Sequence, residues 1–357
     1  MGLMDRLKKA SKIEDASILS DSNISQRTCI DTGIPALNIV FSGRLDGGLM
    51  SGVTVICGES RTFKSVAALI CAKAYLDKYD DAVLVFYDSE GVTKKYFESV
   101  GIDPERVLHV PISDIEMLKF DMVSQLEELK RGDHAFFVID SVGNLASKKE
   151  TQDAIDEKSV ADMSRAKSLK SFYRLITPKL NFKDIPSISI SHTYKNISSF
   201  IPTDVLSGGT GILYSADTVI LISRSTEKQG TEQIGWNFNM TIMKSRHSRE
   251  KKKVPLTVFF NNGVNVFSGL MDMALVSQDV VKPSNGWYQA VDPETGEVIG
   301  NKMRLADTNT HEFWDPILAR PHFKQWVIDN FGIGNNKLLA TDPIESNQVD
   351  EFTADID

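Results

Sequence analysis

The hydrophobic and polar positions of this chain follow two different patterns. Residues 1–30 are mostly polar, and Leu3, Leu7 and Ala10 have the spacing of one face of a short helix. From about residue 50 onward, apolar runs rich in β-branched residues alternate at first with amphipathic helical stretches. This alternation predicts an α/β fold in which most strands lie parallel in one central sheet.

The apolar runs also indicate how the strands are arranged. Those near the middle of the chain are almost continuously apolar, as in strands that helices cover on both faces. The later runs follow at shorter spacing without long helices between them, which predicts antiparallel hairpins appended to the sheet. The expected strands are Val53–Cys57, Ala82–Tyr87, Ala135–Asp140, Ile185–Ser191, Thr218–Ser223, Asn237–Met243 and Val254–Phe260.

The last part of the chain has a different character. Beyond Ser268, a segment containing Trp287, Trp314 and Trp326 shows little periodicity, which predicts a small C-terminal domain. A length of 357 residues also exceeds one typical domain. We therefore expect an N-terminal helical arm at 1–30, an α/β core at 31–267, a small C-terminal domain at 268–340 and a tail at 341–357.

The composition limits the class of protein. With 41% hydrophobic and 25% charged residues, the chain has the composition of a soluble globular protein. Its apolar runs are far shorter than the roughly 18 residues of a membrane helix, and no apolar segment follows the first basic residues, so we expect neither a membrane span nor a secretory signal. The three cysteines lack metal-ligand spacing, in keeping with a reducing compartment.

The net charge of −8 conceals a segregation of charge along the chain. The last seventeen residues carry six acids and no base, and without them the net charge is only −2. The segment from Lys244 to Lys253, in contrast, carries six bases against Glu250. The acidic tail is either a solvated disordered segment or a competitor for anions at basic sites.

The segment after the first expected strand has the spacing of a phosphate-binding loop. Between a strand and a helix, such a loop directs backbone N–H groups at phosphate, its lysine reaches the β- and γ-phosphates, and its serine binds Mg²⁺. Phe63 stands where glycine is usual, so we expect an ordinary backbone conformation there if the loop binds nucleotide. A chance turn is the alternative. The residues of the loop are Gly58, Glu59, Ser60, Arg61, Thr62, Phe63, Lys64, Ser65 and Val66.

Two further strands end in carboxylates. Asp140 follows an apolar strand, as in the Walker B pattern in which the aspartate holds Mg²⁺. Between this strand and the loop, another strand ends in Asp88 and Glu90. A glutamate at such a position can orient water for attack on the γ-phosphate, so we select Glu90 as the catalytic base. The alternative is that both acids only cap a turn.

On these residues the chain resembles the RecA/Rad51 recombinases, and more narrowly the UvsX branch of tailed phages. The resemblance extends from about Asp31 to Trp326. It implies a RecA-like P-loop ATPase that forms filaments on single-stranded DNA, pairs it with homologous double-stranded DNA and exchanges strands, with ATP and Mg²⁺ as cofactors. The motifs that carry it are Gly58–Ser65, Phe86–Glu90, Asp103–Val107, Val138–Glu150 and Ser207–Gly211.

The resemblance also implies roles for single residues around the nucleotide. Lys64, Ser65 and Asp140 match the nucleotide and Mg²⁺ ligands, and Glu90 matches the catalytic glutamate. His192 stands where bacterial relatives have the glutamine that senses the γ-phosphate; a partly buried structural histidine is the alternative. Tyr96 matches the aromatic residue that stacks on adenine, and simple packing on the sheet is its alternative.

DNA contacts are implied for two loops that follow strands of the sheet. Cations there would neutralise the DNA backbone, glycines would let N–H groups approach phosphate, and aromatic rings would stack on bases. Taken singly, each lysine could equally be a solvated surface charge. The implied residues are Lys148, Lys149 and Arg165 for the first loop and the helix after it, and Tyr194, Lys195, Phe200, Gly208 and Gly209 for the second.

Lys244 and Arg246 lie two residues apart at the end of an expected strand, so their side chains should face the same way. They match paired bases that reach the γ-phosphate of the neighbouring subunit in a filament. A solvated basic hairpin is the alternative.

Two other functions remain open at this point. A hexameric helicase with a RecA-like fold would keep the same phosphate chemistry, and a non-hydrolysing DNA-binding filament protein would be favoured by Phe63 alone. For the recombinase, the resemblance implies self-association, a recombination mediator, a single-strand DNA-binding protein as further partner, and a location in the cytoplasm of the infected bacterial host.

Overall fold

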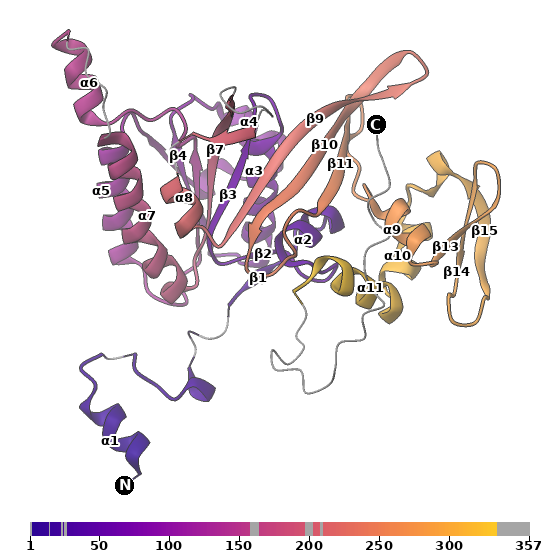
Figure 1. Cartoon of the computed structure of the whole chain (residues 1–357), viewed down its shortest axis with the longest axis horizontal. Helices are drawn as coiled ribbons and strands as arrows, with labels where there is room; N and C mark the ends of the chain where they lie inside the picture. The colour runs from indigo at the N-terminus through magenta and orange to yellow at the C-terminus, as the bar shows by residue number, and fades with distance from the viewer. Residues whose placement is uncertain are drawn as a thin grey trace.

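The computed structural model describes residues 2–333 except 14, 23, 25–26, 158–163, 197–202 and 208–209. A mixed sheet of ten strands runs through the core in the order β12-β11-β10-β9-β3-β7-β6-β4-β5, with β8 paired to β7 (Figure 1). Its strands are β3 (Gly52–Gly58), β4 (Val83–Asp88), β5 (Val107–Pro111), β6 (Ala135–Asp140), β7 (Pro186–Asn196), β8 (Thr203–Leu206), β9 (Thr218–Gln229), β10 (Glu232–Ser245), β11 (Lys253–Phe259) and β12 (Gly263–Val264). The six strands from β9 to β5 are parallel, and β10, β11, β12 and β8 are antiparallel to their neighbours, as expected for an α/β core with appended hairpins.

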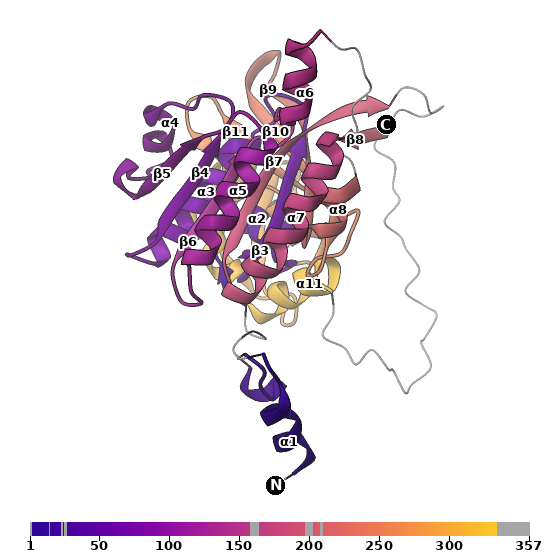
Figure 2. The same ribbon diagram turned by 90° about the vertical axis from the view of Figure 1, so that its left-hand side faces the viewer.

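Helices cover both faces of this sheet. Alternate residues of β3 face opposite cores: Val53 and Val55 pack with α5 and α7, whereas Ile56 packs with α2 and α3. Figure 2 shows α5 and α7 side by side over their face. The helices of the core and arm are α1 (Leu3–Ala10), α2 (Pro35–Ser42), α3 (Lys64–Lys78), α4 (Lys94–Ser99), α5 (Ile115–Glu128), α6 (Lys148–Ile155), α7 (Ser164–Lys183) and α8 (Thr210–Ser215).

The helix of the N-terminal arm lies away from the central sheet and its helices (Figure 1). The expected short helix is present as α1, and its apolar residues Leu3, Met4 and Leu7 are all exposed. A short antiparallel pair of β1 (Cys29–Ile30) and β2 (Leu49–Met50) follows where the arm joins the core. In the described part of the chain, no helix has both the length and the apolar character needed to span a bilayer.

The small C-terminal domain combines helices with an antiparallel sheet. It contains α9 (Leu270–Val276), β13 (Val280–Ser284), β14 (Trp287–Val291), β15 (Val298–Arg304), α10 (His311–Leu318) and α11 (Pro321–Phe331). Trp314 is buried in its core. Buried Asp279 pairs with Arg320 at 3.3 Å and His322 at 3.0 Å, so the ion pairs join β13 to the start of α11.

Several strands of the sheet differ from the expected pattern. β9 continues past the expected Ser223 to Gln229, and β10 begins at Glu232 instead of Asn237. The strand expected at Ile185–Ser191 continues to Asn196 and turns back as β8, so the start of the second predicted DNA loop is a hairpin. Its alternating polar residues concealed this extension. β5 was not predicted; it is an edge strand that buries none of its five residues completely, and His109 interrupts its apolar sequence.

Gly52, at the amino end of β3, lies in a tightly packed position, so adding a side chain there should destabilise the fold. Gly52 has a φ of +104°, and a Cβ atom there would lie 2.4 Å from Oδ2 of Asp217 and 2.5 Å from Oδ1 of Asn181. Gly52→Ala should therefore lower the free energy of unfolding by about 2–5 kcal/mol, measured by urea denaturation, because backbone strain and collision add.

Gly230→Ala is the matched control, since Gly230 also has a positive φ, +62°, but has open space around it. It should cost only the backbone strain, about 1 kcal/mol. Equal losses in the two variants would contradict the collision at Gly52.

Candidate nucleotide and DNA site

The predicted phosphate-binding loop lies between β3 and α3, at the carboxyl edge of the parallel strands. The expectation of an ordinary backbone at Phe63 is wrong: its φ is +66°, in the left-handed region. This conformation costs about 1–2 kcal/mol for a residue with a side chain. The Phe63 ring stacks on Phe238 of β10 with centroids 5.0 Å apart, and such aromatic pairs contribute about 0.5–1.5 kcal/mol. Packing against β10 thus offsets the strain, and the loop keeps its shape without glycine.

Lys64 begins α3 with its side chain folded back over the loop. Its Nζ donates to the carbonyl oxygen of Glu59 at 2.6 Å and lies 3.4 Å from Oγ1 of Thr62. Burial lowers the pKa of Lys64, and the carboxylates of Asp140 and Glu90 oppose that shift. The ammonium is therefore already surrounded by oxygen acceptors at the position where a phosphate chain would lie.

Asp140 is a buried carboxyl at the end of β6. Burial raises its pKa to about 6, a hydrogen bond from Ser65 opposes the shift, and the charge of Glu90 adds to it. A hydroxyl and a buried carboxylate side by side form an oxygen donor set of the kind that Mg²⁺ prefers, and a bound cation would favour the ionised carboxylate. The residues present therefore fit a Mg²⁺ ion.

Glu90 faces the same cavity from the end of β4. Oε1 of Glu90 accepts hydrogen bonds from Nδ2 of Asn144 at 2.7 Å and from Oγ of Ser141 at 3.0 Å. Nε2 of His192 lies 3.3 Å from the same oxygen. Neither Ser141 nor Asn144 was assigned a role from the sequence, although both follow the Walker B strand directly.

Asp88, two residues before Glu90, has a structural role. Its carboxylate accepts the backbone N–H groups of Glu90, Gly91 and Val92 at 2.7–2.8 Å, and Nε2 of His109 lies 2.9 Å away. Burial opposes ionisation, but His109 and these N–H groups together lower the pKa of Asp88. Of the two acids, only Asp88 caps the turn, which leaves Glu90 directed at the cavity.

One cavity of about 380 Å³ is lined by Lys64, Ser65, Glu90 and Asp140 together with Tyr96 and His192. Tyr96 projects from α4, and its hydroxyl is hydrogen-bonded to Ser65; burial and the charge of Asp140 raise its pKa to about 12. His192 is level with Gly58 in the register of β7 and β3. The cavity thus brings together side chains from four strands or the turns that follow them.

The described residues that were predicted to contact DNA belong to α6, α7 and β7. Lys148 and Lys149 were expected in a loop but begin α6, because Ser147 and Glu150 form a capping box there. Tyr194 of β7 is exposed. Lys195 also belongs to β7, with its backbone paired to Asp204. Phe200, Gly208 and Gly209 lie outside the described residues.

Arg165, the remaining predicted DNA contact, points back at the protein. Its guanidinium donates to the carbonyl oxygens of Val142, Gly143 and Leu145 at 3.2, 2.7 and 2.8 Å. In this structure Arg165 therefore fixes the turn that follows Asp140.

Lys244 and Arg246 reach the last turn of α8 and the two residues that follow it. Nζ of Lys244 donates to the carbonyl oxygens of Leu213 and Ala216 at 2.7 Å, and Nε of Arg246 lies 2.7 Å from Oδ1 of Asp217. Burial and the charge of Arg246 lower the pKa of Lys244. Asp217 accepts the N–H of Val53, so Arg246 lies at the amino end of β3, about 15 Å of strand from the phosphate-binding loop.

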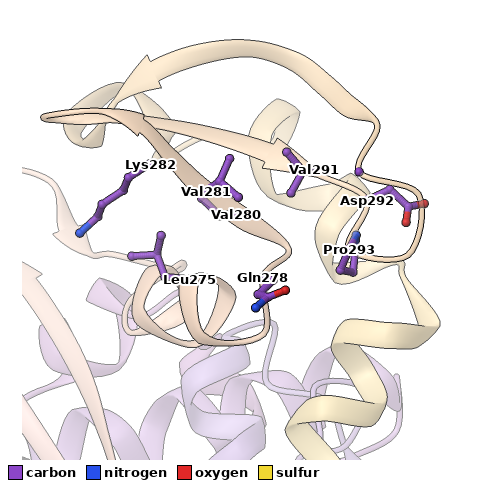
Figure 3. Close-up of a pocket in the computed structure, with 9 residues that line it drawn as sticks. Leu275, Gln278, Val280, Val281, Lys282, Val291, Asp292 and Pro293 are labelled. Atoms are coloured by element: carbon purple, nitrogen blue, oxygen red, sulfur yellow. The ribbon is translucent and has the colours of Figure 1, made fainter.

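A larger cavity of about 550 Å³ lies in the C-terminal domain (Figure 3). Its wall is mainly aliphatic, with Leu275, Val280 and Val281 on one side and Val291 on the other. Lys282 and Asp292 extend outward at opposite ends, so the cavity lacks a convergent set of polar groups.

Comparison with known proteins identifies the family. Residues 5–265 match the model of the RecA N-terminal domain, and residues 267–327 match that of the C-terminal domain of the bacteriophage T4 recombination and repair protein. The recombination and repair protein of Enterobacteria phage T4 is 42% identical over 359 residues, which cover 99% of this chain and 90% of that protein. RecA of Malacoplasma penetrans is 24% identical over 68% of this chain and 72% of its own length, and RecA of Rhodococcus jostii is 23% identical over 88% of each. The chain therefore belongs to the RecA family of recombinases, in the branch of the phage recombination and repair proteins.

Proposed function

We propose that this protein hydrolyses ATP with Mg²⁺ while assembled as a filament on single-stranded DNA, pairs that strand with a homologous duplex and exchanges the strands. The observation that carries the proposal is the meeting of Lys64, Ser65, Asp140 and Glu90 around one cavity in a RecA-family chain. It acts with a recombination mediator and a single-strand DNA-binding protein in the cytoplasm of the infected host. Its parts are the arm at 1–30, the core at 31–267, the C-terminal domain at 268–340 and the acidic tail at 341–357.

In hydrolysis each residue has a distinct task. Lys64 neutralises the β- and γ-phosphates, and Ser65 and Asp140 hold Mg²⁺, which supplies positive charge to phosphate oxygens when bound. Glu90 orients the attacking water and accepts its proton. Tyr96 supports the base of the nucleotide. His192 donates to the γ-phosphate while contacting Glu90, so both groups respond to the same phosphate.

Lys244 and Arg246 act on the neighbouring subunit. Arg246 lies at the amino end of β3, and Lys244, level with Val55 in mid-strand, extends its Nζ to Ala216 on that side, whereas the phosphate-binding loop of the same chain follows the carboxyl end. Two cations so placed can reach only the phosphate of another copy, where they stabilise the charge of the transition state. A complete catalytic site then requires two adjacent subunits.

DNA lies along the face that carries the two loops. Lys148, Lys149 and Arg165 neutralise phosphates beside the first loop, and Tyr194 and Lys195 approach the strand from the hairpin. Phe200, Gly208 and Gly209 complete the second loop, the aromatic ring stacking on bases. Sequence is read by base pairing between the two DNA molecules, so these contacts need only recognise the backbone and the base faces.

Strand exchange tests the proposed function. With ATP and Mg²⁺, the protein should transfer a labelled single strand into a homologous duplex and leave a heterologous duplex unchanged. Electron micrographs of the same reactions should contain open filaments. Closed rings, or phosphate release without any exchange, would contradict the recombinase and favour a helicase.

Glu90→Gln should retain ATP binding and lose ATP hydrolysis. The amide keeps the size of the side chain but cannot accept a proton from water. Phosphate release in the presence of single-stranded DNA should fall at least about a hundredfold, a barrier increase of roughly 2.7 kcal/mol. Asp88→Asn is the control, because Asp88 caps the turn. If only Asp88→Asn loses activity, Glu90 is not the catalytic base.

Mixed filaments test the action of the basic pair on a neighbour. Lys64→Ala and the double variant Lys244→Ala, Arg246→Ala should each show little DNA-stimulated hydrolysis alone. When mixed, a Lys64→Ala subunit supplies intact bases to the competent loop of the double variant, so part of the activity should return. Absence of recovery at every ratio, with co-assembly verified by labelled subunits, would exclude action between subunits.

A further inference from the structure

The turn after β6 connects the predicted DNA loops to the predicted catalytic base. Val142 and Leu145 are buried, and the N–H of Val142 donates to the carbonyl oxygen of Ile190 in β7 at 2.9 Å. Asn144, between these anchors, is exposed. Its backbone is therefore held by the core while its side chain is free of packing and points at Glu90.

The carboxylate of Glu90 is held through one oxygen. Asn144, Ser141 and His192 all contact Oε1, and the contact from Asn144, at 2.7 Å, is the shortest of the three. Among the described residues, none donates a hydrogen bond to Oε2. A carboxylate fixed in this way presents the other oxygen to water.

Residues beside both predicted DNA loops form hydrogen bonds to this turn. Arg165, which follows the first loop, donates to three carbonyl oxygens of the turn, including that of Gly143 at 2.7 Å. Ser207, which follows the hairpin of the second loop, places its Oγ 3.3 Å from the same carbonyl oxygen. A Cβ atom on Gly143 would lie 3.1 Å from His192, so the turn has little room to move unless these contacts change.

We propose that Asn144 is a positioning residue for Glu90 and that Arg165 controls it by fixing the turn, so that DNA at the first loop acts on hydrolysis through this connection. The inference rests on the proposed function. The described acceptors of Arg165 are neutral carbonyls, and a DNA phosphate is a stronger, charge-assisted acceptor for a guanidinium. When the guanidinium of Arg165 binds a DNA phosphate instead of the three carbonyl oxygens, the turn can move. Asn144 moves with the turn and changes the orientation of the Glu90 carboxylate.

Asn144→Ala tests the first half of the proposal. In saturating single-stranded DNA, kcat for ATP hydrolysis should fall about tenfold to a hundredfold, because a hydrogen bond to a charged group is lost. The KM for ATP and the affinity for DNA should stay within about twofold of wild type, since Asn144 contacts only the carboxylate. Asn144→Gln retains the donor and should restore part of kcat.

Gln125→Ala is the matched control for loss of a side-chain amide that is only partly buried. Gln125 donates to Asp121 on α5 at 2.6 Å, far from both loops, and its removal should leave kcat unchanged. Thermal unfolding of all variants should coincide with wild type. The positioning role is overturned if Asn144→Ala retains wild-type kcat, or if its kcat falls and Asn144→Gln fails to recover any of it.

Arg165→Lys tests the second half. Lysine keeps the charge that binds phosphate but cannot bridge three carbonyl oxygens with a planar fork. We expect near wild-type affinity for single-stranded DNA and a loss of at least about fivefold in the stimulation of hydrolysis by DNA. Weakened DNA affinity with full stimulation at saturation would make Arg165 a phosphate ligand alone and overturn the connection.

These outcomes are distinguishable from failure of the proposed function itself. If Glu90→Gln abolishes hydrolysis while Asn144→Ala does not, the ATPase assignment stands and the inference about Asn144 fails. If Glu90→Gln hydrolyses ATP normally, the base is elsewhere, and both statements about Glu90 fail together.

Discussion

The register of four parallel strands is the constraint on which the site depends. Asp88 is level with Asp140 in the pairing of β4 and β6, and Gly58 is level with His192 in the pairing of β3 and β7. Because all four strands end at the same edge, groups about 30 to 130 residues apart in the chain converge without any contribution from long loops. A slip of one residue would turn a carboxylate to the wrong face of the sheet in the pairing of β4 and β6, and His192 in the pairing of β3 and β7.

Much of this arrangement could be predicted from the sequence, since strand ends and motifs are local features. The order of strand, loop and helix around Lys64 and the carboxylates after two apolar strands required only neighbouring residues. The roles of Asn144 and Arg165 could not be predicted, because they depend on distances across the sheet that no spacing encodes. The β7–β8 hairpin was concealed for a different reason: its outer half is polar, so its pattern matches a loop.

The positive φ of Phe63 shows where a local rule fails for a physical reason. Backbone preference for glycine is an average over surroundings, and here a tertiary contact with Phe238 offsets much of the cost of the left-handed conformation. Lys148 and Lys149 show the opposite case, in which the local capping residues Ser147 and Glu150 begin a helix where the resemblance implied a loop. Such errors concern boundaries of elements and leave the placement of the carboxylates unchanged.

The stacking of Phe63 on Phe238 has a consequence for how the chain can diverge. A loop with glycine at this position places no demand on β10, so its partner strand is free to vary. Here Phe63 and Phe238 support each other, and replacing Phe238, or replacing Phe63 by a smaller residue other than glycine, leaves a strained backbone without that contact. During divergence of this branch, the two rings are therefore expected to be kept together or replaced together. The sequence of β10 in the antiparallel extension and that of the phosphate-binding loop should then change together.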